Sequence, residues 1–559
     1  MNRFFIVNIV FSIFMVSGHL AYSQGNVNQE VKVIKAYVPV VNDAHRISEL
    51  PKIVDTNKVI TKFEYEILPA RHNTSFTPTE IKAARLISEP LSKLYYGYAK
   101  VGFGSYLSPL AQVHFGSKRS KQWNWNTLLS HKSSHGKIKN EVGDKVYAGI
   151  SDTKISAQAN YFTKTHKVFS LGSEYSNNIN YYYGFNPKQI VKPIEPPLLK
   201  DSIENQIVNF FNIKGNWKSN YLDSSNMNYD IDLKFQTLSA KQNITENALK
   251  IDASLNYFFE KEYVGADLSL DYYKHQGIAD SLNGSIVKFS PWIGAFGDKW
   301  RVIVGVTTFY DQSKLDYFFS PRLSMHYNVI DYFLIPYLEV NGGYNVNSYK
   351  DIYDENPFIV QNLGVKPTET KINITLGIRG NISSKIAFNT KVSYSKVKDQ
   401  YFFVNDTSIF LQNKFDVVYD DLDKIRVLGE LSYNTGENLS VSLRGNYYNY
   451  TLSTEKYAWH LPNYKISLNA RYVIQNKIIL TSNIFALGSR HVKEFDKNNQ
   501  LLDKELSGIV DINLGAEYRL SKMFSAFAYF NNIAAVKYYE WNHYPSQQFN
   551  MMLGVTYSF

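Results

Sequence analysis

Histidine and acidic side chains are the residues of this sequence that could bind a metal or move a proton. The 559-residue chain has 12 scattered His, no HExxH motif and no Cys. No two His lie at ligand spacing on a predicted helix, so we expect no zinc site. A chain without Cys also has no disulfide, no thiol-linked lipid and no thiol chemistry. We therefore predict no metal and no cofactor.

Three His residues near the ends of predicted loops are the candidates for hydrolytic chemistry. They are His131, His135 and His491. A hydrolase needs such a residue beside a Ser or an Asp in a fixed constellation, and no motif around these His indicates one. We interpret them as solvated loop residues and predict that the protein is not an enzyme.

An acidic group and a glycine pair are the remaining candidates for ligand sites. Asp351, Asp354 and Glu355 fall in a predicted loop but lack the regular spacing of a calcium loop, so a solvated acidic loop is favoured. Gly102 and Gly104 lie within a predicted strand, where close packing explains glycine more simply than a phosphate cradle.

The formal net charge of +10 raises the question of nucleic-acid binding. Lys and Arg are spread along the chain without basic helices or clusters, which argues against a nucleic-acid partner. We interpret the charge as attraction to anionic lipid or surface polysaccharide at most.

The last residues of the chain have the clearest pattern of the elements that would position these side chains. Residues 549–559 alternate between apolar and mostly small or polar side chains, which predicts a strand with one apolar and one polar face. A strand of a soluble sandwich has the same pattern but seldom ends the chain on an aromatic residue. Tyr557 and Phe559 resemble the assembly signal of bacterial outer-membrane barrels, which implies the barrel-assembly machinery as a partner.

The first 23 residues have the features of a secretory signal peptide. A basic start is followed by an apolar run over residues 4–16 and by small residues before the predicted cleavage between Ser23 and Gln24. The alternative, a transmembrane anchor, is disfavoured because Asn8 and Ser12 interrupt the run, which is shorter than the ~20 apolar residues of a span. We expect residues 1–23 to be removed on export.

The composition favours a barrel over other exported proteins. Tyr (43) and Phe (35) dominate the apolar content, and the mean hydropathy is −0.29. A membrane barrel combines lipid-facing apolar residues and aromatic girdles with polar lumen residues, which gives this composition. A secreted all-β protein is the plainer alternative.

Residues 24–93 differ from the rest of the chain. Residues 31–41 are extended and apolar, and several prolines follow. Thr77, Pro78 and Glu80 form a capping box with Pro at the first helical position, which predicts a short helix to about residue 86. We interpret residues 24–93 as an arm in the periplasm or in the barrel lumen.

Residues 94–559 are predicted to form the barrel itself. Apolar residues occupy every second position in residues 264–272, 372–378, 466–472 and 512–518, with polar or charged residues between them. Charges on so many inner faces would be costly in a dry core and are acceptable in a wet lumen. The expected lumen charges are mixed in sign: Asp252, Asp267, Asp271, Arg379, Lys391, Arg444, Lys465, Arg471, Glu517 and Arg519.

The connections alternate between short turns and long loops, which sets the orientation. Short turns are expected at 297–299, 381–384, 435–438, 475–476 and 521–522, and long loops at 184–205, 348–370, 453–461, 489–506 and 537–547. In outer-membrane barrels the short turns face the periplasm and the long loops face outward. Alternation from Tyr95 predicts an all-β, antiparallel transmembrane barrel of about 22 strands, with 20 to 24 as the range.

The last third of the chain resembles the barrel of TonB-dependent receptors. The resemblance rests on Glu517-Tyr518-Arg519, the Asn531-Asn532 pair, Tyr538-Tyr539, Tyr544-Pro545 and the closing stretch 554–559. It implies a 22-stranded outer-membrane barrel that takes part in transport, with outer-membrane lipid and TonB as partners. The Tyr- and Asn-rich composition and the mature start at Gln24 are similar to those of Bacteroidetes proteins.

The chain departs from that family at its amino-terminal end. The family's plug is Gly-rich and about twice as long as residues 24–93, which contain only Gly25. We therefore expect a barrel without the standard plug, and residues 31–36 resemble a TonB-contacting strand only faintly. The alternative function is a non-transporting scaffold in an assembly, secretion or glycan-capture complex, with an outer-membrane protein or lipoprotein as partner.

Overall fold

The computed structural model describes residues 94–186, 199–221, 226–259, 262–277, 283–495 and 501–559. The chain divides into two compact units, Met1–Ser88 and Glu89–Phe559, and all described residues belong to the second. The predicted signal peptide with its Ser23–Gln24 cleavage, and the predicted arm with its helix, lie outside the described residues.

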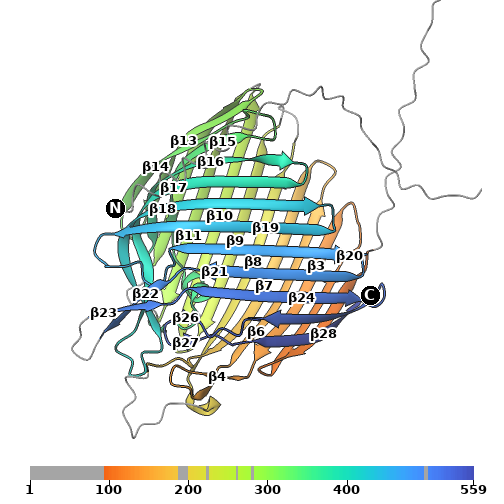
Figure 1. Ribbon diagram of the computed structural model, residues 1–559. Helices are drawn as coiled ribbons and strands as arrows, with labels where there is room; N and C mark the ends of the chain where they lie inside the picture. The colour runs from red at the N-terminus through yellow and green to blue at the C-terminus, as the bar shows by residue number, and fades with distance from the viewer. Residues whose placement is uncertain (1–93, 187–198, 222–225, 260–261, 278–282, 496–500) are drawn as a thin grey trace, which may run out of the picture. The chain divides into compact units, whose positions relative to one another are not determined.

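The second unit is a closed antiparallel barrel of 22 strands (Figure 1). The wall is closed by β1 and β28, which pair from Tyr98↔Ser558 to Gly104↔Met552. This confirms the predicted fold class and strand number. The wall strands are β1 (Gly97–Gly104), β2 (Ser108–Gly116), β3 (Trp123–Ser134), β6 (Ile150–Phe162), β7 (Lys167–Tyr181), β8 (Asn205–Ser219), β9 (Asn228–Ala240), β10 (Ile244–Phe259), β11 (Glu262–Gln276), β12 (Gly284–Phe296), β13 (Trp300–Asp311), β14 (Asp316–Tyr327), β15 (Ile335–Asn345), β16 (Thr368–Ser383), β17 (Ile386–Asn405), β18 (Phe415–Thr435), β19 (Leu439–Leu452), β20 (Tyr464–Ile474), β21 (Ile478–Leu487), β24 (Ile509–Arg519), β25 (Phe524–Asn531) and β28 (Asn550–Ser558).

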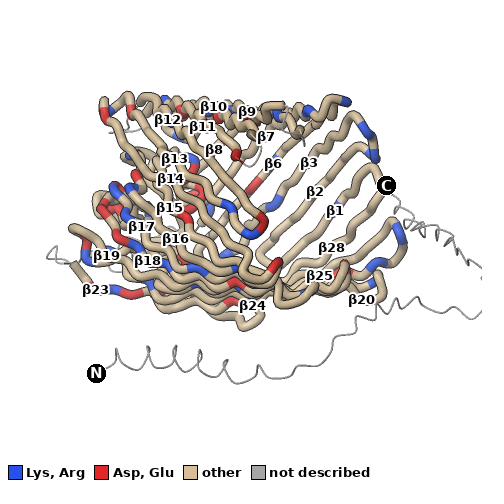
Figure 2. The backbone as a smooth tube through the Cα atoms, turned by 90° about the horizontal axis from the view of Figure 1, so that it is seen from above, with Lys and Arg blue, Asp and Glu red and all other residues tan. Residues whose placement is uncertain are grey.

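The predicted alternation of side chains is present in the wall. On β11, Val264 and Leu268 are exposed on the outer face, whereas Ser269, which follows Leu268 and points to the opposite face, is buried. The inward charges pair with each other: Lys250 lies 3.5 Å from Asp271, and Arg444 lies 2.9 Å from Glu430. Charged residues of both signs occur along the strands in the view from above (Figure 2). The outside is thus apolar and the lumen is polar, as a bilayer around a wet interior requires.

The two ends of the barrel differ in their connections, as the sequence predicts. At the end where Phe559 lies, called the turn end here, the strands are joined by short turns. Gln475 and Asn476 have φ values of 50° and 56°, which is the primed turn that suits the twist of a hairpin. At the other end, called the loop end, the long connections carry secondary structure of their own.

The loop end contains elements that the sequence analysis did not predict. Three hairpins lie there, β4 (Lys137–Lys139) with β5 (Lys145–Tyr147), β22 (Arg490–Phe495) with β23 (Leu501–Leu506), and β26 (Tyr539–Trp541) with β27 (Tyr544–Pro545). The 3-10 helix η3 (Lys200–Ser202) and the α-helix α2 (Tyr349–Glu355) complete this end. Of the residues described, none forms a helix long and apolar enough to cross a membrane.

The chain terminus lies in the closing strand pair. The backbone N–H of Tyr96 donates to the carbonyl of Phe559 over 2.7 Å, and the Phe559 ring meets Phe115 edge-on at 5.4 Å. Gly102 is required for close packing, because a Cβ at this position would lie 2.9 Å from the Phe527 ring. Tyr557 and Phe559 are thus placed where the wall closes, and their role as an assembly signal stays a prediction.

Candidate functional site

The connection between β15 and β16, residues 346–367, is the candidate functional element and is called the lid here. It contains α2, whose N-cap Ser348 accepts a hydrogen bond from the Asp351 backbone, while the Asp351 side chain accepts one from the Ser348 backbone. This capping box fixes the start of the helix. The helix buries Tyr349, Ile352 and Tyr353, so its apolar face points into the protein rather than into solvent.

One side of the lid is held by strands β7, β8 and β10. Asn180 Nδ2 donates to the Tyr353 hydroxyl over 2.7 Å, and Gln206 Nε2 donates to the Tyr349 hydroxyl over 2.8 Å. The backbone N–H of Tyr349 donates to Glu246 Oε2 over 2.6 Å. These buried bonds to a carboxylate and two amides fix the position of α2 against this part of the wall.

The other side of the lid is joined to β18. Ile359 forms a parallel bridge with Phe415, and the Val360 N–H donates to the Phe415 carbonyl over 2.8 Å. Around the ring of 22 strands β8 is the sixth and β18 the sixteenth, so these two attachments lie on nearly opposite walls. The lid therefore crosses the lumen at the loop end instead of standing out from the rim.

A hydrophobic cluster fills the crossing. It combines lid residues with strand and loop residues, all of them buried: Tyr182, Val208, Phe210, Leu238, Tyr349, Ile352, Tyr353, Phe358, Ile359, Val360, Leu363, Val365, Phe403, Phe415, Val417 and Tyr544. A Phe358 ring stacked on Tyr544 at 3.7 Å joins the lid to the connection 532–549. Burial raises the pKa of Tyr544 well above its ordinary value, and its neutral hydroxyl donates to the Asn413 carbonyl.

A buried histidine lies beside this cluster, in the connection 453–463. His460 is 5 % exposed, its ring meets Phe415 and Trp541, and its Nδ1 lies 2.9 Å from the Phe403 carbonyl. Since a carbonyl only accepts, Nδ1 carries the proton. Burial lowers the pKa of His460 to about 3, with the positive charges of Arg490 and His543 adding to the effect. The residue is therefore neutral at physiological pH.

The hairpin connections are tied to one another by ion pairs. His543 Nδ1 lies 3.0 Å from Glu141 Oε1 in the β4–β5 hairpin, and its Nε2 lies 3.9 Å from Glu494 Oε2 in the β22–β23 hairpin. Burial alone would raise the pKa of Glu141, but the hydrogen bond and charge of His543 lower it overall. Within the described ranges, no three His, Asp or Glu groups are arranged to hold a metal ion.

The three histidines that are candidates for hydrolytic chemistry each contact a different residue. His131 Nδ1 contacts Thr153 Oγ1 at 2.8 Å, His135 Nδ1 contacts the Tyr147 hydroxyl at 3.0 Å, and the His491 ring stacks on Tyr457 at 3.7 Å. No pair of these histidines shares a site.

The acidic group is solvent-exposed, as expected, but belongs to α2 and not to a loop. Asp351 caps the helix, Asp354 pairs with Lys350, and Glu355 accepts from the Tyr401 hydroxyl over 2.6 Å. The expectation of an irregular loop here is therefore wrong. The Ser-x-x-Asp capping box that begins at Ser348 was the sequence signal that could have found the helix.

Comparison with known proteins supports the fold and no closer relationship. No protein-family model matches the chain, and no curated protein matches it. The FrpB iron transporter from Neisseria meningitidis aligns with a TM-score of 0.62 at 12 % identity, over 84 % of this chain and 82 % of that one. The pyoverdine outer membrane receptor FpvA from Pseudomonas aeruginosa has a TM-score of 0.62 at 10 % identity, over 84 % and 79 %. The ferric-catecholate import receptor Fiu from E. coli has a TM-score of 0.60 at 9 % identity, over 83 % and 82 %.

At these identities the shared property is the barrel. The resemblance to TonB-dependent receptor barrels that the sequence suggested is confirmed at the level of the fold. The absence of the standard plug stays a prediction, because residues 24–93 lie outside the described residues.

Proposed function

We propose that the protein is an outer-membrane β-barrel of the TonB-dependent receptor type, exported by a cleaved signal peptide, that takes part in transport across the outer membrane. The observation that carries the proposal is a closed 22-stranded wall with an apolar outside and a charged lumen. Barrels of this size are typical of transporters whose lumen is plugged. The structural neighbours described as an iron transporter and as an import receptor support the transport class.

The lid gives the proposal a mechanism. A lumen of this width would leak unless something obstructed it, and the lid crosses it at the loop end between nearly opposite walls. In the outer membrane the loop end faces outward, so the lid stands between the medium and the lumen. Transport then requires that the lid open, and its buried aromatic cluster keeps it closed at rest.

The buried lid also favours a second candidate function, that of a non-transporting scaffold. In this candidate the lid, which joins β8 to β18 through a buried core, is a permanent brace of the barrel. In that case the protein would serve an assembly, secretion or glycan-capture complex together with an outer-membrane protein or lipoprotein. A TonB partner would belong to the transport candidate, through a strand near residues 31–36.

Conductance in planar bilayers tests whether the lid and the arm obstruct an otherwise open lumen, which the transport proposal requires. The lid ends are adjacent, since Asn347 Nδ2 donates to the Lys366 carbonyl over 2.9 Å, so a four-residue Gly-Ser linker can replace residues 348–365. The full chain is compared with this lid deletion, with a deletion of arm residues 26–75, and with both deletions combined. Heat-modifiable migration on gels checks that each barrel is folded.

Transport predicts that the full chain is nearly silent and that removal of the lid, alone or with the arm, yields large steady currents. The difference in current between the lid deletion and the double deletion then measures how much the arm obstructs the lumen. A folded double deletion that conducts no more than the full chain would contradict the transport proposal and leave the scaffold.

A further inference from the structure

The ladder between β14 and β15 is unusually short. It pairs only Leu323↔Val340 to His326↔Tyr337, whereas β14 pairs with β13 along its whole length, from Trp300↔Tyr327 to Asp311↔Asp316. Residues 316–322 of β14 therefore run beside 341–345 of β15 without forming ladder pairs. Across the described residues of the wall, no other pair of neighbouring strands shares so short a ladder.

The sequence of β14 explains why this stretch stays unpaired. Pro321 has no N–H to donate, and its carbonyl accepts from the Ser320 hydroxyl over 3.3 Å. The Tyr317 N–H donates to its neighbour Asp316 over 2.8 Å. On the opposing strand β15, the register with its other neighbour β16 shifts between Asn341 and Gly343, which is a bulge beside the unpaired stretch. Strands avoid pairing at an edge through proline, through bulges, and through backbone N–H groups that are hydrogen-bonded within their own strand.

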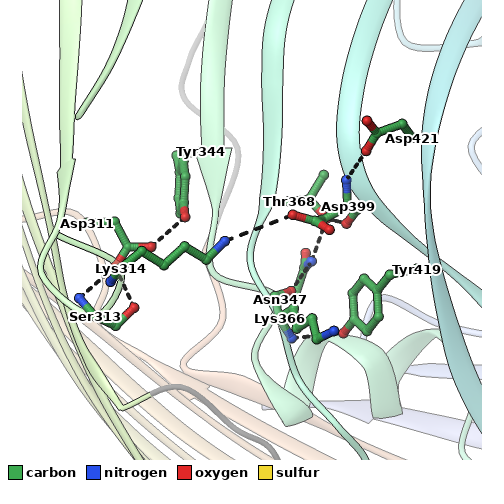
Figure 3. A network of polar contacts seen from close by, with 10 residues as sticks. All are labelled: Asp311, Ser313, Lys314, Tyr344, Asn347, Lys366, Thr368, Asp399, Tyr419 and Asp421. Carbon is green, nitrogen blue, oxygen red and sulfur yellow. Dashed lines mark hydrogen bonds and ion pairs between the residues drawn. The ribbon is translucent and has the colours of Figure 1, made fainter. Parts of the chain in front are cut away.

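Side chains close the loop end of this unpaired stretch (Figure 3). The Tyr344 hydroxyl donates to Asp311 Oδ2 over 2.5 Å, which ties β15 to the β13–β14 hairpin. Lys314 Nζ lies 3.9 Å from Asp399 Oδ2, which ties the same hairpin to β17. We call these two contacts the clasp. Two single side-chain contacts stabilise a strand pair less than a continuous backbone ladder does.

On the lumen side, a polar pocket of about 520 Å³ borders the short ladder. Arg322 forms an ion pair with Asp267 and donates to Ser290 Oγ over 3.1 Å. Lys288 and Glu339 add one charge of each sign to the lining. The pocket therefore suits a charged or zwitterionic head group better than an apolar chain.

On the outer side, an apolar groove of about 840 Å³ lies across β13 to β18 and borders the same ladder. Met325 and Leu338, which are paired partners in the ladder, line it together with Val302, Leu376, Val392 and Val427. In a membrane this groove faces the hydrocarbon core, where acyl chains fill such a space.

We propose that the β14–β15 ladder is a lateral gate through which a phospholipid, or an amphiphile of the same build, passes between the lumen and the bilayer. The head group would occupy the polar pocket and the chains the apolar groove, with only the short ladder between them. Unpaired backbone groups are costly in hydrocarbon, so a wall opens most easily where fewest pairs must break. The inference rests on the proposed position of the barrel in the membrane.

A photocrosslinking probe in the pocket tests the gate. The full chain carries p-benzoylphenylalanine in place of Lys288, in liposomes of phosphatidylethanolamine and phosphatidylglycerol, and irradiation is followed by mass analysis of the lipid adduct. The paired variants Ser324→Cys and Glu339→Cys lock the ladder as a disulfide, the only one possible in a chain without natural Cys. We expect an adduct that falls at least tenfold on oxidation and returns on reduction.

Two controls separate the possible failures. Thr375→Cys with Ser393→Cys locks the long β16–β17 ladder, also on the lumen face, and should leave the adduct unchanged. The probe in place of outward Val392 should capture lipid in every state. Lack of capture there would overturn the proposed membrane position.

Capture at Val392 without capture at Lys288 would overturn the gate alone, as would a Lys288 adduct that the β14–β15 lock does not change. If the Lys288 variant fails to insert, Thr307 in the same pocket carries the probe.

Discussion

Two stretches of the same wall, β17–β18 and β14–β15, are built in opposite ways. The β17–β18 ladder runs from Ile386↔Tyr433 to Asn405↔Phe415, and its upper part supplies the core on which the lid rests. The β14–β15 ladder ends at Leu323↔Val340. From there toward the loop end no ladder pairs form, and the Tyr344–Asp311 side-chain contact joins β15 to the β13–β14 hairpin instead. Long ladders thus carry the fixed parts of this barrel, and the short ladder marks the part that can move.

The two stretches also differ in what stabilises them. The lid is held by buried apolar and aromatic side chains, which lose a large area to water on opening. The clasp is held by two single polar contacts, in which Asp311 is buried and Lys314 and Asp399 are partly exposed, and their net contribution is on the order of 1 kcal/mol each. Changes in the lid core should therefore have larger effects than changes in the clasp.

The largest expected effect follows from truncation of Phe415, which is fully buried beneath the lid. Phe415→Ala removes a large core side chain and should weaken lid closure by about 3 to 5 kcal/mol. We expect trypsin to cleave at Lys350 in α2 roughly 100-fold to several thousand-fold faster than in the unchanged protein, because cleavage follows the population of the open lid.

The matched control for this truncation is Phe319→Ala. Phe319 is 64 % exposed on the outer face of β14, so its loss should leave cleavage in the lid unchanged. Equal cleavage in both variants would show that the cluster around Phe415 does not hold the lid, and the contrast between the two wall stretches would then fail.

Acid should open the lid without any mutation. His460 has a pKa of about 3 in the closed state, compared with 6.5 for an ordinary histidine. His460 contacts Phe415, to which the lid is bridged, so a state in which this attachment is loosened and His460 is solvated binds a proton that the closed state excludes. Closure is then fully stable above pH 6.5 and weakens as the pH falls toward 3. At pH 4.5 the loss is about 2 to 3 kcal/mol.

Hydrogen exchange of residues 346–367 at pH 7 and pH 4.5, corrected for the intrinsic rates, measures this loss. His460→Phe keeps an aromatic ring in the site but cannot titrate, so its lid should show little of this pH dependence. A wild-type lid equally protected at both pH values would contradict the assignment of a buried, neutral His460.

The sequence predicted the wall well and the lid poorly, for physical reasons. The alternation of residues 264–272 and the turn at Gln475-Asn476 are local signals, because side-chain direction and turn type depend on neighbouring residues. Tyr349, in contrast, is buried by Gln206 and Glu246, more than a hundred residues away, and no local pattern shows this.

For helix α2 and the unpaired stretch of β14, which the sequence analysis does not predict, the sequence signals are one or two residues each. Ser348 and Asp351 form a capping box, but Asp351 is also one of three neighbouring acidic residues, a pattern that predicts a solvated loop. Pro321 within an otherwise regular strand marks a place where a ladder partner is missing. Each signal is weak alone, since only tertiary contacts decide whether a capped turn or an unpaired edge persists.

A substitution at Gly342 should disturb the short ladder more than the same substitution next to it. A Cβ at Gly342 would lie 2.2 Å from Ser320 Oγ and 2.7 Å from the Thr370 carbonyl, whereas a Cβ at Gly343 meets nothing within 4 Å. We expect Gly342→Ala to destabilise the barrel by about 1 to 3 kcal/mol and Gly343→Ala to be nearly neutral. The midpoint of the heat-modifiable shift on gels compares them, and equal midpoints would mean that β14 and β15 are free to move apart at this point.

The smallest expected effect follows from removal of a single hydrogen bond of the clasp. Tyr344→Phe removes the hydroxyl that donates to Asp311, while Asp311 keeps its bond from the Ser313 N–H at 2.8 Å. Loss of one such bond should favour opening by about 1 kcal/mol, which corresponds to about fivefold faster hydrogen exchange of residues 323–326. Tyr337→Phe is the control, because its hydroxyl bonds to Asn389 over 2.9 Å at the paired end of the same strand. If both variants speed exchange equally, the unpaired stretch opens no more readily than its surroundings, and the clasp has no special part in holding β14 to β15.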